Sequence, residues 1–205
     1  MALNIGITGG IGSGKTTVCK IFELLGIPVY YADDRAKWII THQKEVVKQI
    51  KAACGVEAYT PEGDYNRPYI ANIVFQDRNR LETLNQIVHP AVFLDGLEWQ
   101  KSHANQPYTL KEAALLFESG SYQMHDKIIC VTAPEEIRIQ RVMKRDSLDR
   151  AAVQARIDKQ LPEAEKVDRS DYVIHNFADK SLIRQVLDIH QALLALAKQA
   201  SDPNL

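Results

Sequence analysis

One stretch near the start of the chain combines glycines, a lysine and hydroxyl side chains at a spacing suited to phosphate chemistry. Residues 6–17 read GITGGIGSGKTT, which fits the pattern G-x-x-x-x-G-K-[ST] from Gly9 to Thr16. Glycines let a loop bring backbone N–H groups onto phosphate oxygens, and a helix that begins there directs the positive end of its dipole at the same anion. The pattern therefore predicts a phosphate-binding loop (P-loop) rather than a chance glycine-rich turn.

Each residue type in this loop has a defined task. We expect Lys15 to reach the β and γ phosphates of ATP and the Thr16 hydroxyl to ligate Mg²⁺. The predicted ATP-binding residues are Gly10, Gly12, Ser13, Gly14, Lys15, Thr16 and Thr17. Such a loop serves kinases, ATPases and switch GTPases alike, so it does not define a reaction by itself. The sequence contains no NKxD motif for guanine, which disfavours the GTPase interpretation.

The segments around the loop alternate between strand and helix patterns. Helical spacing begins at Lys15, a second helix is expected to open at Pro134, and Ser147 is expected to cap a third that ends near Pro162. Strands are predicted at residues 3–8, 29–33, 108–118, 127–133 and 171–176, and a long amphipathic helix at 179–200. This alternation indicates an α/β fold with a doubly wound parallel sheet.

The acceptor side is sought among acids and a histidine outside the loop. Asp33 is expected to end the second strand, where a carboxylate can take the proton from an attacking hydroxyl. A loop acid or helix cap is an equally good interpretation of that position, and Asp34 better suits the capping or surface role. The region 35–105 is expected to be mostly helical, with a break at His89 and Pro90. A lone histidine there is more often a packing residue than a catalyst.

An arginine cluster follows the fourth predicted strand. Arg138, Arg141 and Arg145 are spaced by three and four residues, which places them on one helix face. A segment of this kind can close over a triphosphate and neutralise its charge. Spacing alone favours a solvated face paired with Glu135 and Asp146. Two further acids near the third predicted strand, Glu112 and Glu118, are candidates for the metal side or for a capping or surface role.

Taken together, these segments resemble the dephospho-CoA kinase family over nearly the whole length. The resemblance is carried by the loop and by VYYADDRAK, LLFESG, RVMKRD with ARIDKQ, and the central block from Asn66 to Val92 with its Asn85 and His89-Pro90 signatures. It implies a kinase of the P-loop type that transfers the γ-phosphate of ATP, with Mg²⁺, to the ribose 3′-hydroxyl of dephospho-CoA. It also implies that Asp33 is the catalytic base and that Arg141 and Arg145 are lid residues.

The resemblance also implies a division of the chain. The nucleotide-binding core is expected in residues 1–34, 106–137 and 166–205, a helical acceptor insertion in 35–105 and an arginine-bearing lid in 138–165. Within the insertion, we expect His89 to contact the ribose end of the acceptor. The sequence departs from the family at Tyr31, where an aspartate is common, and at Glu112 and Ala114, which replace an aspartate and a proline.

Two other functions stay open at this point. One is a P-loop kinase that acts on a nucleoside monophosphate or a small alcohol, and the other is a nucleotide-dependent switch without phosphotransfer. The 205 residues suit one α/β domain with insertions, and the net charge of −1 shows no global basic field for nucleic acid or an anionic membrane. Three scattered cysteines and the lack of a long apolar segment predict a cytoplasmic protein.

Overall fold

The computed structural model describes residues 2–178 and 180–201. The chain forms two compact units, one from Met1–Tyr31 with Gln100–Leu205 and one from Ala32–Trp99. The finer division into core, insertion and lid stays a prediction. Within the described residues, no helix combines the length and apolar character needed to span a bilayer.

The first unit is built on a sheet whose neighbouring strands all run parallel. Among the described residues the strand order is β2-β3-β1-β4-β5, so the winding of the chain changes direction beside β1. Ligands of doubly wound sheets bind beyond the carboxyl ends of the strands at such a point, and the P-loop starts there. The doubly wound parallel fold is confirmed. The strands are β1 (Leu3–Thr8), β2 (Val29–Tyr31), β3 (Tyr108–Glu112), β4 (Lys127–Thr132) and β5 (Tyr172–His175).

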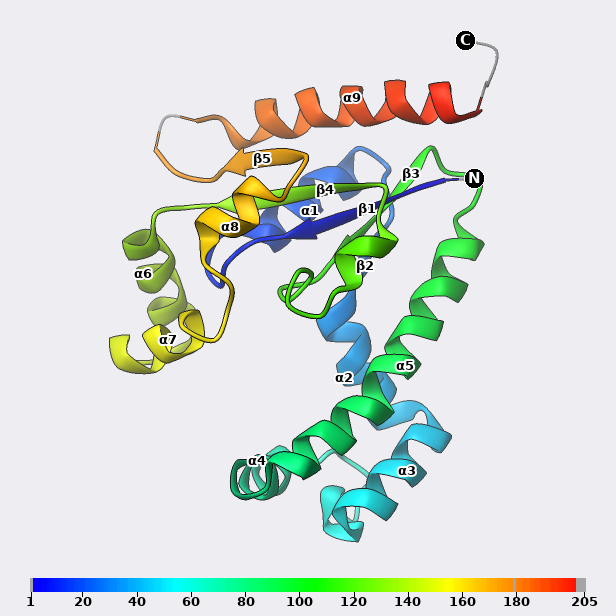
Figure 1. Cartoon of the computed structure of the whole chain (residues 1–205), viewed down its shortest axis with the longest axis vertical. Coiled ribbons are helices and arrows are strands. Elements are labelled where there is room, and N and C mark those ends of the chain that lie inside the picture. Colours follow the sequence, from blue (N-terminus) through cyan, green and yellow to red (C-terminus); the bar gives the residue numbers. More distant parts are fainter. Residues whose placement is uncertain (1, 179, 202–205) are drawn as a thin grey trace. The chain divides into compact units, whose positions relative to one another are not determined.

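Helices follow the strands in chain order (Figure 1). In the first unit they are α1 (Lys15–Leu24), α6 (Glu135–Asp146), α7 (Arg150–Ile157), α8 (Glu163–Asp168), α9 (Leu182–Ser201) and the short 3₁₀ helix η2 (Ser121–Met124). In the second unit they are α2 (Ala32–His42), α3 (Lys44–Cys54), α4 (Arg67–Gln76) and the short 3₁₀ helix η1 (Val56–Ala58), and α5 (Arg78–Ser102) runs from the second unit into the first.

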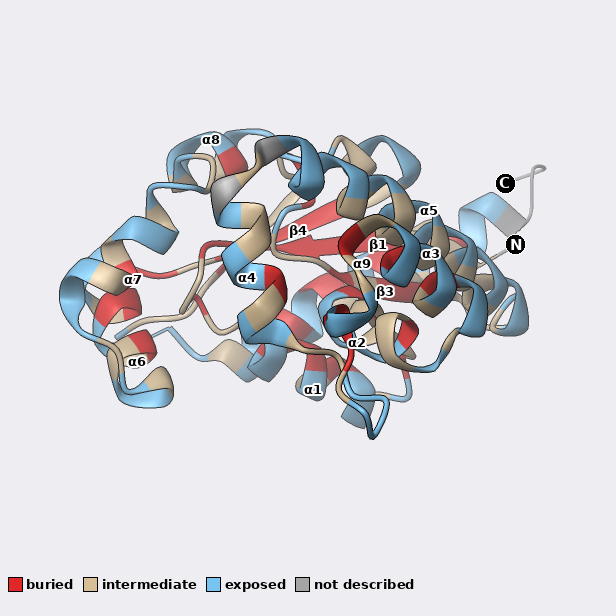
Figure 2. Cartoon of the chain, turned by 90° about the horizontal axis from the view of Figure 1, so that it is seen from below, coloured by how far each residue is buried: buried red, intermediate tan, exposed pale blue. Residues whose placement is uncertain are grey.

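Both faces of the sheet are covered. Ile5 and Ile7 of β1 pack in one cluster with Phe22 of α1 and Val186 of α9. Ile128 of β4 belongs to a second cluster with Leu116 and Phe117. Figure 2 shows β1, β3 and β4 in red inside paler helices, as expected for parallel strands buried on both sides. Burial on both faces fixes β1, and therefore the start of the P-loop, rigidly in the core.

The strand predictions were correct in place, but only the first had the observed bounds and the other four were too long, most clearly the second and third. The strand at 3–8 has the expected bounds, whereas the second strand ends at Tyr31 and the third at Glu112. The register explains both ends, because Tyr31 pairs with Glu112 and Glu112 pairs with Ile7, close to where β1 turns into the loop. After β3 the Ala113 N–H still donates to the Ile7 carbonyl at 3.1 Å, but the strand pairing ends at Glu112. After β2 the next acidic residues, Asp33 and Asp34, suit a helix N-terminus.

Two expected helix signals were wrong. Asp149, rather than Ser147, caps α7, because its Oδ1 accepts a hydrogen bond from the N–H of Ala152 at 2.7 Å. The helix α5 also runs without a break through His89 and Pro90. Proline removes the helical partner of the carbonyl four residues earlier, but Pro90 and Gln86 are both exposed, so water can serve that carbonyl. The start of the long helix predicted at Asp179, and the tail beyond Ser201, lie outside the described residues.

The second unit has its own core. Ile39 of α2, Ile50 and Cys54 of α3 and Ala58 of η1 are almost fully buried in one cluster, and residues of α4 and α5 pack against it. An ion pair between Arg35 of α2 and Asp95 of α5 ties two of these helices together, with Arg35 Nε 2.9 Å from Asp95 Oδ2. The expectation that this region is mostly helical is confirmed.

Candidate active site

The P-loop turns into α1 at a glycine that cannot be replaced. Gly14 has φ +96°, a left-handed conformation that side-chain-bearing residues rarely adopt. A Cβ atom there would also collide with the side-chain amide of Asn176. The turn lets α1 begin at Lys15 with its N-terminal N–H groups directed at the loop, which is the arrangement that binds phosphate at a helix N-terminus.

The loop gathers a cation and hydroxyl groups around this helix end. The Lys15 side chain is 9% exposed, and its Nζ donates to the carbonyls of Gly9 at 3.0 Å and Gly10 at 3.4 Å. Its ammonium group therefore lies within the loop. Thr16 and Thr17 are exposed on the first turn of α1, while the Ser13 hydroxyl is buried and has no hydrogen-bond partner among the described residues. Charge, hydroxyls and helix dipole thus converge on one anion site.

Arg138 of α6 is a buried residue that packs against the loop. Its side chain is only 4% exposed, and its Nε lies 3.0 Å from the Ala133 carbonyl and 2.8 Å from Glu163 Oε2. A Cβ atom at Gly10 would collide with its guanidinium group. The solvated-face interpretation is therefore wrong for Arg138, although a longer contact to Glu135 at 3.5 Å is also present.

Arg141 connects the same helix to the loop through backbone carbonyls. Its Nη1 is 3.4 Å from the carbonyls of Gly12 and Ser13, and its Nη2 donates to the Asn176 carbonyl at 3.0 Å. The Asn176 side chain in turn donates to the Ser13 carbonyl at 2.8 Å. Asn176 follows β5 at the carboxyl edge of the sheet, so its position could have signalled a site residue.

The segment after α7 is attached to the loop as well. The Gln160 Oε1 accepts a hydrogen bond from the N–H of Ile11 at 2.8 Å. Next to it, the fully buried Lys166 lies 2.7 Å from Glu118. Burial alone would raise the pKa of Glu118, but hydrogen bonds from Lys166 and from the Leu161 N–H lower it below its usual value. Glu118 is therefore held as a carboxylate in a buried ion pair. No motif in the sequence indicated that Lys166 would be its partner or that Gln160 would contact the loop.

The C-terminal end of α6 carries an exposed arginine, unlike the buried Arg138 near its start. Arg145 is 63% exposed and pairs with its neighbour Asp146 at 2.7 Å. Arg156 of α7 reaches the same carboxylate at 3.0 Å, and Arg150 pairs with Glu136 at 2.7 Å. These arginines thus match the solvated-face interpretation, with each charge balanced by an exposed or half-exposed acid. Exposed pairs of this kind are weak and easily exchanged for a phosphate.

The residues predicted to serve the acceptor lie in the second unit. Asp33 is exposed in the first turn of α2, so the expectation that it ends a strand is wrong. Asp34 pairs with Lys37 at 2.7 Å on the surface, in line with its expected role. His89 is exposed on α5, which leaves its imidazole accessible and speaks against a purely packing role. The Arg35–Asp95 pair links the helices that carry Asp33 and His89.

The side-chain oxygen atoms at the loop are suitable ligands for the expected Mg²⁺. Mg²⁺ in nucleotide sites usually keeps several waters and takes only one or two protein oxygens besides the phosphates. The exposed Thr16 hydroxyl beside the anion site can supply one such oxygen. Glu112, 8% exposed at the end of β3, is a nearby strand-end carboxylate in the same unit. No group of three or more His, Cys, Asp or Glu side chains that could hold a metal occurs in the described part of the chain.

Glu112 also influences a buried cysteine in the second turn of α1. Burial, followed by the negative charge of Glu112, raises the pKa of the Cys19 thiol far above its ordinary value, and Lys15 partly offsets this. Cys19 is therefore a neutral packing residue in α1 and not a nucleophile. Because the charges of Glu112 and Lys15 both shift the pKa of Cys19, both groups act on the same buried region.

A parallel sheet wound in this order, with a P-loop at its switch point and buried arginine support, defines a P-loop kinase. A family model described as dephospho-CoA kinase matches residues 3–181, and the chain belongs to that family. A protein named dephospho-CoA kinase from Salinibacter ruber is 43% identical over 175 residues, which cover 84% of this chain and 87% of that protein. Another of that name, from Syntrophotalea carbinolica, is 35% identical over 98% of this chain and 97% of its own length.

Solved structures agree with this assignment. The structure of TT1252 from Thermus thermophilus superposes with a TM-score of 0.79 at 34% identity, covering 95% of this chain and 97% of that one. Dephospho-CoA kinase from Campylobacter jejuni superposes with a TM-score of 0.72 at 26% identity, covering 95% of this chain and 98% of that one. The family expected from the sequence motifs is therefore confirmed.

Proposed function

We propose that this chain transfers the γ-phosphate of ATP to the ribose 3′-hydroxyl of dephospho-CoA, which yields coenzyme A and ADP as the last step of coenzyme A synthesis. The observation that carries the proposal is the formed P-loop, with the Lys15 ammonium buried among its carbonyls, in a chain that belongs to the dephospho-CoA kinase family. In the reaction the bond between the γ-phosphorus and the bridging oxygen breaks, and a new bond forms to the ribose 3′-oxygen.

Lys15 is proposed as the cation that leaves its loop carbonyls for the β and γ phosphates when ATP binds. The N–H groups of Gly10, Gly12, Ser13 and Gly14 and the first turn of α1 would surround the phosphates, with the hydroxyls of Thr16 and Thr17 at the helix end. Mg²⁺, when bound through Thr16, neutralises charge on the phosphates. The preformed loop supplies the remaining stabilisation without reorganisation during the reaction.

Asp33 is proposed as the base that accepts the proton of the 3′-hydroxyl. An exposed carboxylate is accessible to a substrate hydroxyl, and in phosphoryl transfer its main task is to hold that hydroxyl in line with the γ-phosphate. His89 is proposed to contact the ribose end of the acceptor. Its exposed imidazole supports this role, whereas the expected helix break at Pro90, which first suggested it, does not exist.

The arginine segment is proposed to act in two parts. Arg141 holds the loop through its carbonyls and is available to the γ-phosphate when ATP binds. Arg145 would exchange Asp146 for phosphate as the segment closes, because exposed ion pairs cost little to break. The proposed moving part is thus the end of α6 together with α7, while Arg138 stays fixed against Glu163.

The proposed surroundings follow from composition. The three cysteines are buried and free, which suits a reducing compartment, so we propose a cytoplasmic enzyme with ATP and dephospho-CoA as its small-molecule partners. A screen of ADP release with dephospho-CoA, AMP and small alcohols tests the acceptor. We expect kcat/KM for dephospho-CoA to exceed that for the other acceptors by orders of magnitude. Equal rates with AMP, or equal ADP release without any acceptor, would overturn the proposal.

A further inference from the structure

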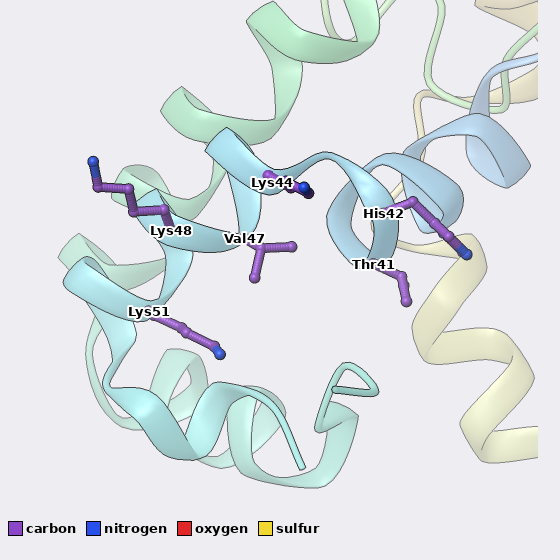
Figure 3. A pocket seen from close by; sticks show the side chains of 6 residues that line it. All are labelled: Thr41, His42, Lys44, Val47, Lys48 and Lys51. Atoms are coloured by element: carbon purple, nitrogen blue, oxygen red, sulfur yellow. The ribbon is translucent and has the colours of Figure 1, made fainter. Parts of the chain in front are cut away.

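A hollow on the second unit has three lysines among the six residues that line it. It has a volume of about 390 Å³ and lies between the end of α2 and one face of α3, where Thr41, His42, Lys44, Val47, Lys48 and Lys51 surround it. Figure 3 shows Thr41, Val47 and Lys51 directed toward this space, with Lys48 extending outward beside it. The volume lies in the lower part of the range of ligand pockets.

The spacing of the lysines concentrates their charge. Lys44, Lys48 and Lys51 are four and three residues apart, so they share one face of α3. Like charges one turn apart repel each other and disfavour the helix. No carboxylate of the described residues pairs with them, and the acid next to Lys44, Glu45, accepts a hydrogen bond from Gln49 instead. A bound anion would relieve this repulsion.

Two further features add to the positive potential. The hollow includes Lys44 in the first turn of α3, a helix whose N-cap residue Gln43 makes no side-chain capping bond. The positive end of that helix dipole therefore lies at the hollow, and Glu45 is the one acid in the first turn of this helix. His42 is stacked on Trp38 with its Nδ1 2.9 Å from the Trp38 carbonyl. A carbonyl only accepts, so Nδ1 carries the proton and the ring is held in a fixed orientation.

We infer that this lysine hollow binds the diphosphate of the acceptor. The inference rests on the proposed function, because dephospho-CoA carries a diphosphate between its adenosine and its pantetheine arm. The P-loop is committed to the phosphates of ATP, so the acceptor diphosphate needs a cationic site of its own. Lysine ammonium groups bind phosphate as flexible point charges. Three lysines of α3 line the hollow, and Figure 3 shows Lys51 directed into it while Lys48 extends outward, where its flexible stem can still turn toward a bound anion.

The test compares two variants with the same change in net charge. In the first, Lys44, Lys48 and Lys51 are replaced by Gln, which keeps much of each stem but removes the charge. The control replaces Lys101, Lys180 and Lys198 by Gln, outside the hollow. Binding of dephospho-CoA is measured by calorimetry with the P-loop filled by a non-hydrolysable ATP analogue, at several salt concentrations. Steady-state KM and kcat for dephospho-CoA are measured in parallel.

We expect the hollow variant to weaken dephospho-CoA binding and raise its KM by about tenfold, with kcat within about twofold of wild type. Its affinity should also depend less on salt, while the control behaves as wild type. Unchanged affinity and salt dependence in a folded hollow variant would overturn the inference, as would an equal loss in the control. Wild-type protein that binds dephospho-CoA without phosphorylating it would instead refute the proposed function, which separates the two failures.

Discussion

The P-loop and the acceptor-side residues are built in opposite ways. Lys15 is 9% exposed, and the loop around it is held by side chains from α6, from the segment after α7 and from the end of β5. Asp33 and His89, in the other unit, are exposed on helix surfaces. A phosphate site works best when its dipoles are fixed before the substrate arrives. If Asp33 and His89 serve the acceptor as proposed, their exposed side chains can take their working geometry from the substrate itself.

The largest effect should come from the fixed side. We expect Lys15→Ala to abolish phosphotransfer in a folded protein, because losing one preorganised charge donor costs about 2.7–4 kcal/mol of transition-state stabilisation or more. The measurement is coenzyme A formation, with circular dichroism as the check on folding. Turnover near that of wild type in a folded variant would remove the loop from the active site.

On the exposed side, Asp33→Asn should lower kcat by about 10²–10⁴-fold while ATP affinity stays close to wild type, since the amide keeps the shape but cannot accept a proton. Asp34→Asn is the matched control, because Asp34 is 72% exposed and paired only with Lys37. Steady-state kinetics and ATP titration of both variants decide the matter. A collapse of ATP affinity with kcat preserved, or equal losses at both positions, would contradict the assignment of Asp33 as base.

Within the arginine segment, the contrast between fixed and exposed residues can be measured as stability. Arg138→Ala leaves Glu163 without its partner next to the loop, and we expect a loss of about 3 kcal/mol in the free energy of unfolding. Arg145→Ala breaks only an exposed pair and should change stability by about 0.5 kcal/mol or less. Urea denaturation of the two variants gives both values. Similar losses of stability in both variants would mean that the two ends of α6 do not differ in how firmly their arginines are held.

Acid should weaken the unit that carries the loop. His125 packs against Gly6 of β1, and neither of its ring nitrogens has a hydrogen-bond partner among the described residues. Burial, and then the charge of Lys111, lower its pKa from 6.5 to about 4. Because the folded state binds this proton more weakly, stability is complete above pH 6.5 and falls as the pH drops toward 4.

The loss amounts to roughly 3 kcal/mol between pH 7 and pH 4, about 1.4 kcal/mol for each pKa unit. His125→Leu should flatten that part of the profile, whatever its effect at pH 7. Denaturation at a series of pH values measures the slope. An identical slope in wild type and variant would show that other groups cause the acid sensitivity of this unit.

A modest effect on kinetics is expected at the exposed histidine. We expect His89→Ala to raise KM for dephospho-CoA by several-fold to about tenfold, with kcat and KM for ATP near wild type, because an exposed contact contributes modestly to binding. Kinetics at a temperature where the variant is folded measure this split. A lower melting temperature with unchanged KM would assign His89 to packing.

The features that could be predicted from the sequence are those that depend on short, local stretches of residues. The loop, its flanking strand and helix, and the parallel sheet depend on short motifs and apolar runs, so Gly14 and Lys15 were placed correctly. Asp33 was assigned to a strand because the pattern VYYAD does not reveal where hydrogen-bonded partners end. Arg138 and Gln160 could not be recognised as loop supports, since burial and long-range hydrogen bonds depend on tertiary packing.

The central claim is that the fixed loop and the exposed acceptor residues together phosphorylate one hydroxyl of one acceptor. Its most direct test is to incubate the protein with ATP, Mg²⁺ and dephospho-CoA and to identify the product by mass spectrometry with fragmentation of the ribose. The account predicts a gain of one phosphoryl group on the 3′-oxygen, with one ADP formed for each coenzyme A. ADP release with dephospho-CoA recovered unmodified, or a phosphoryl group elsewhere on the molecule, would contradict it.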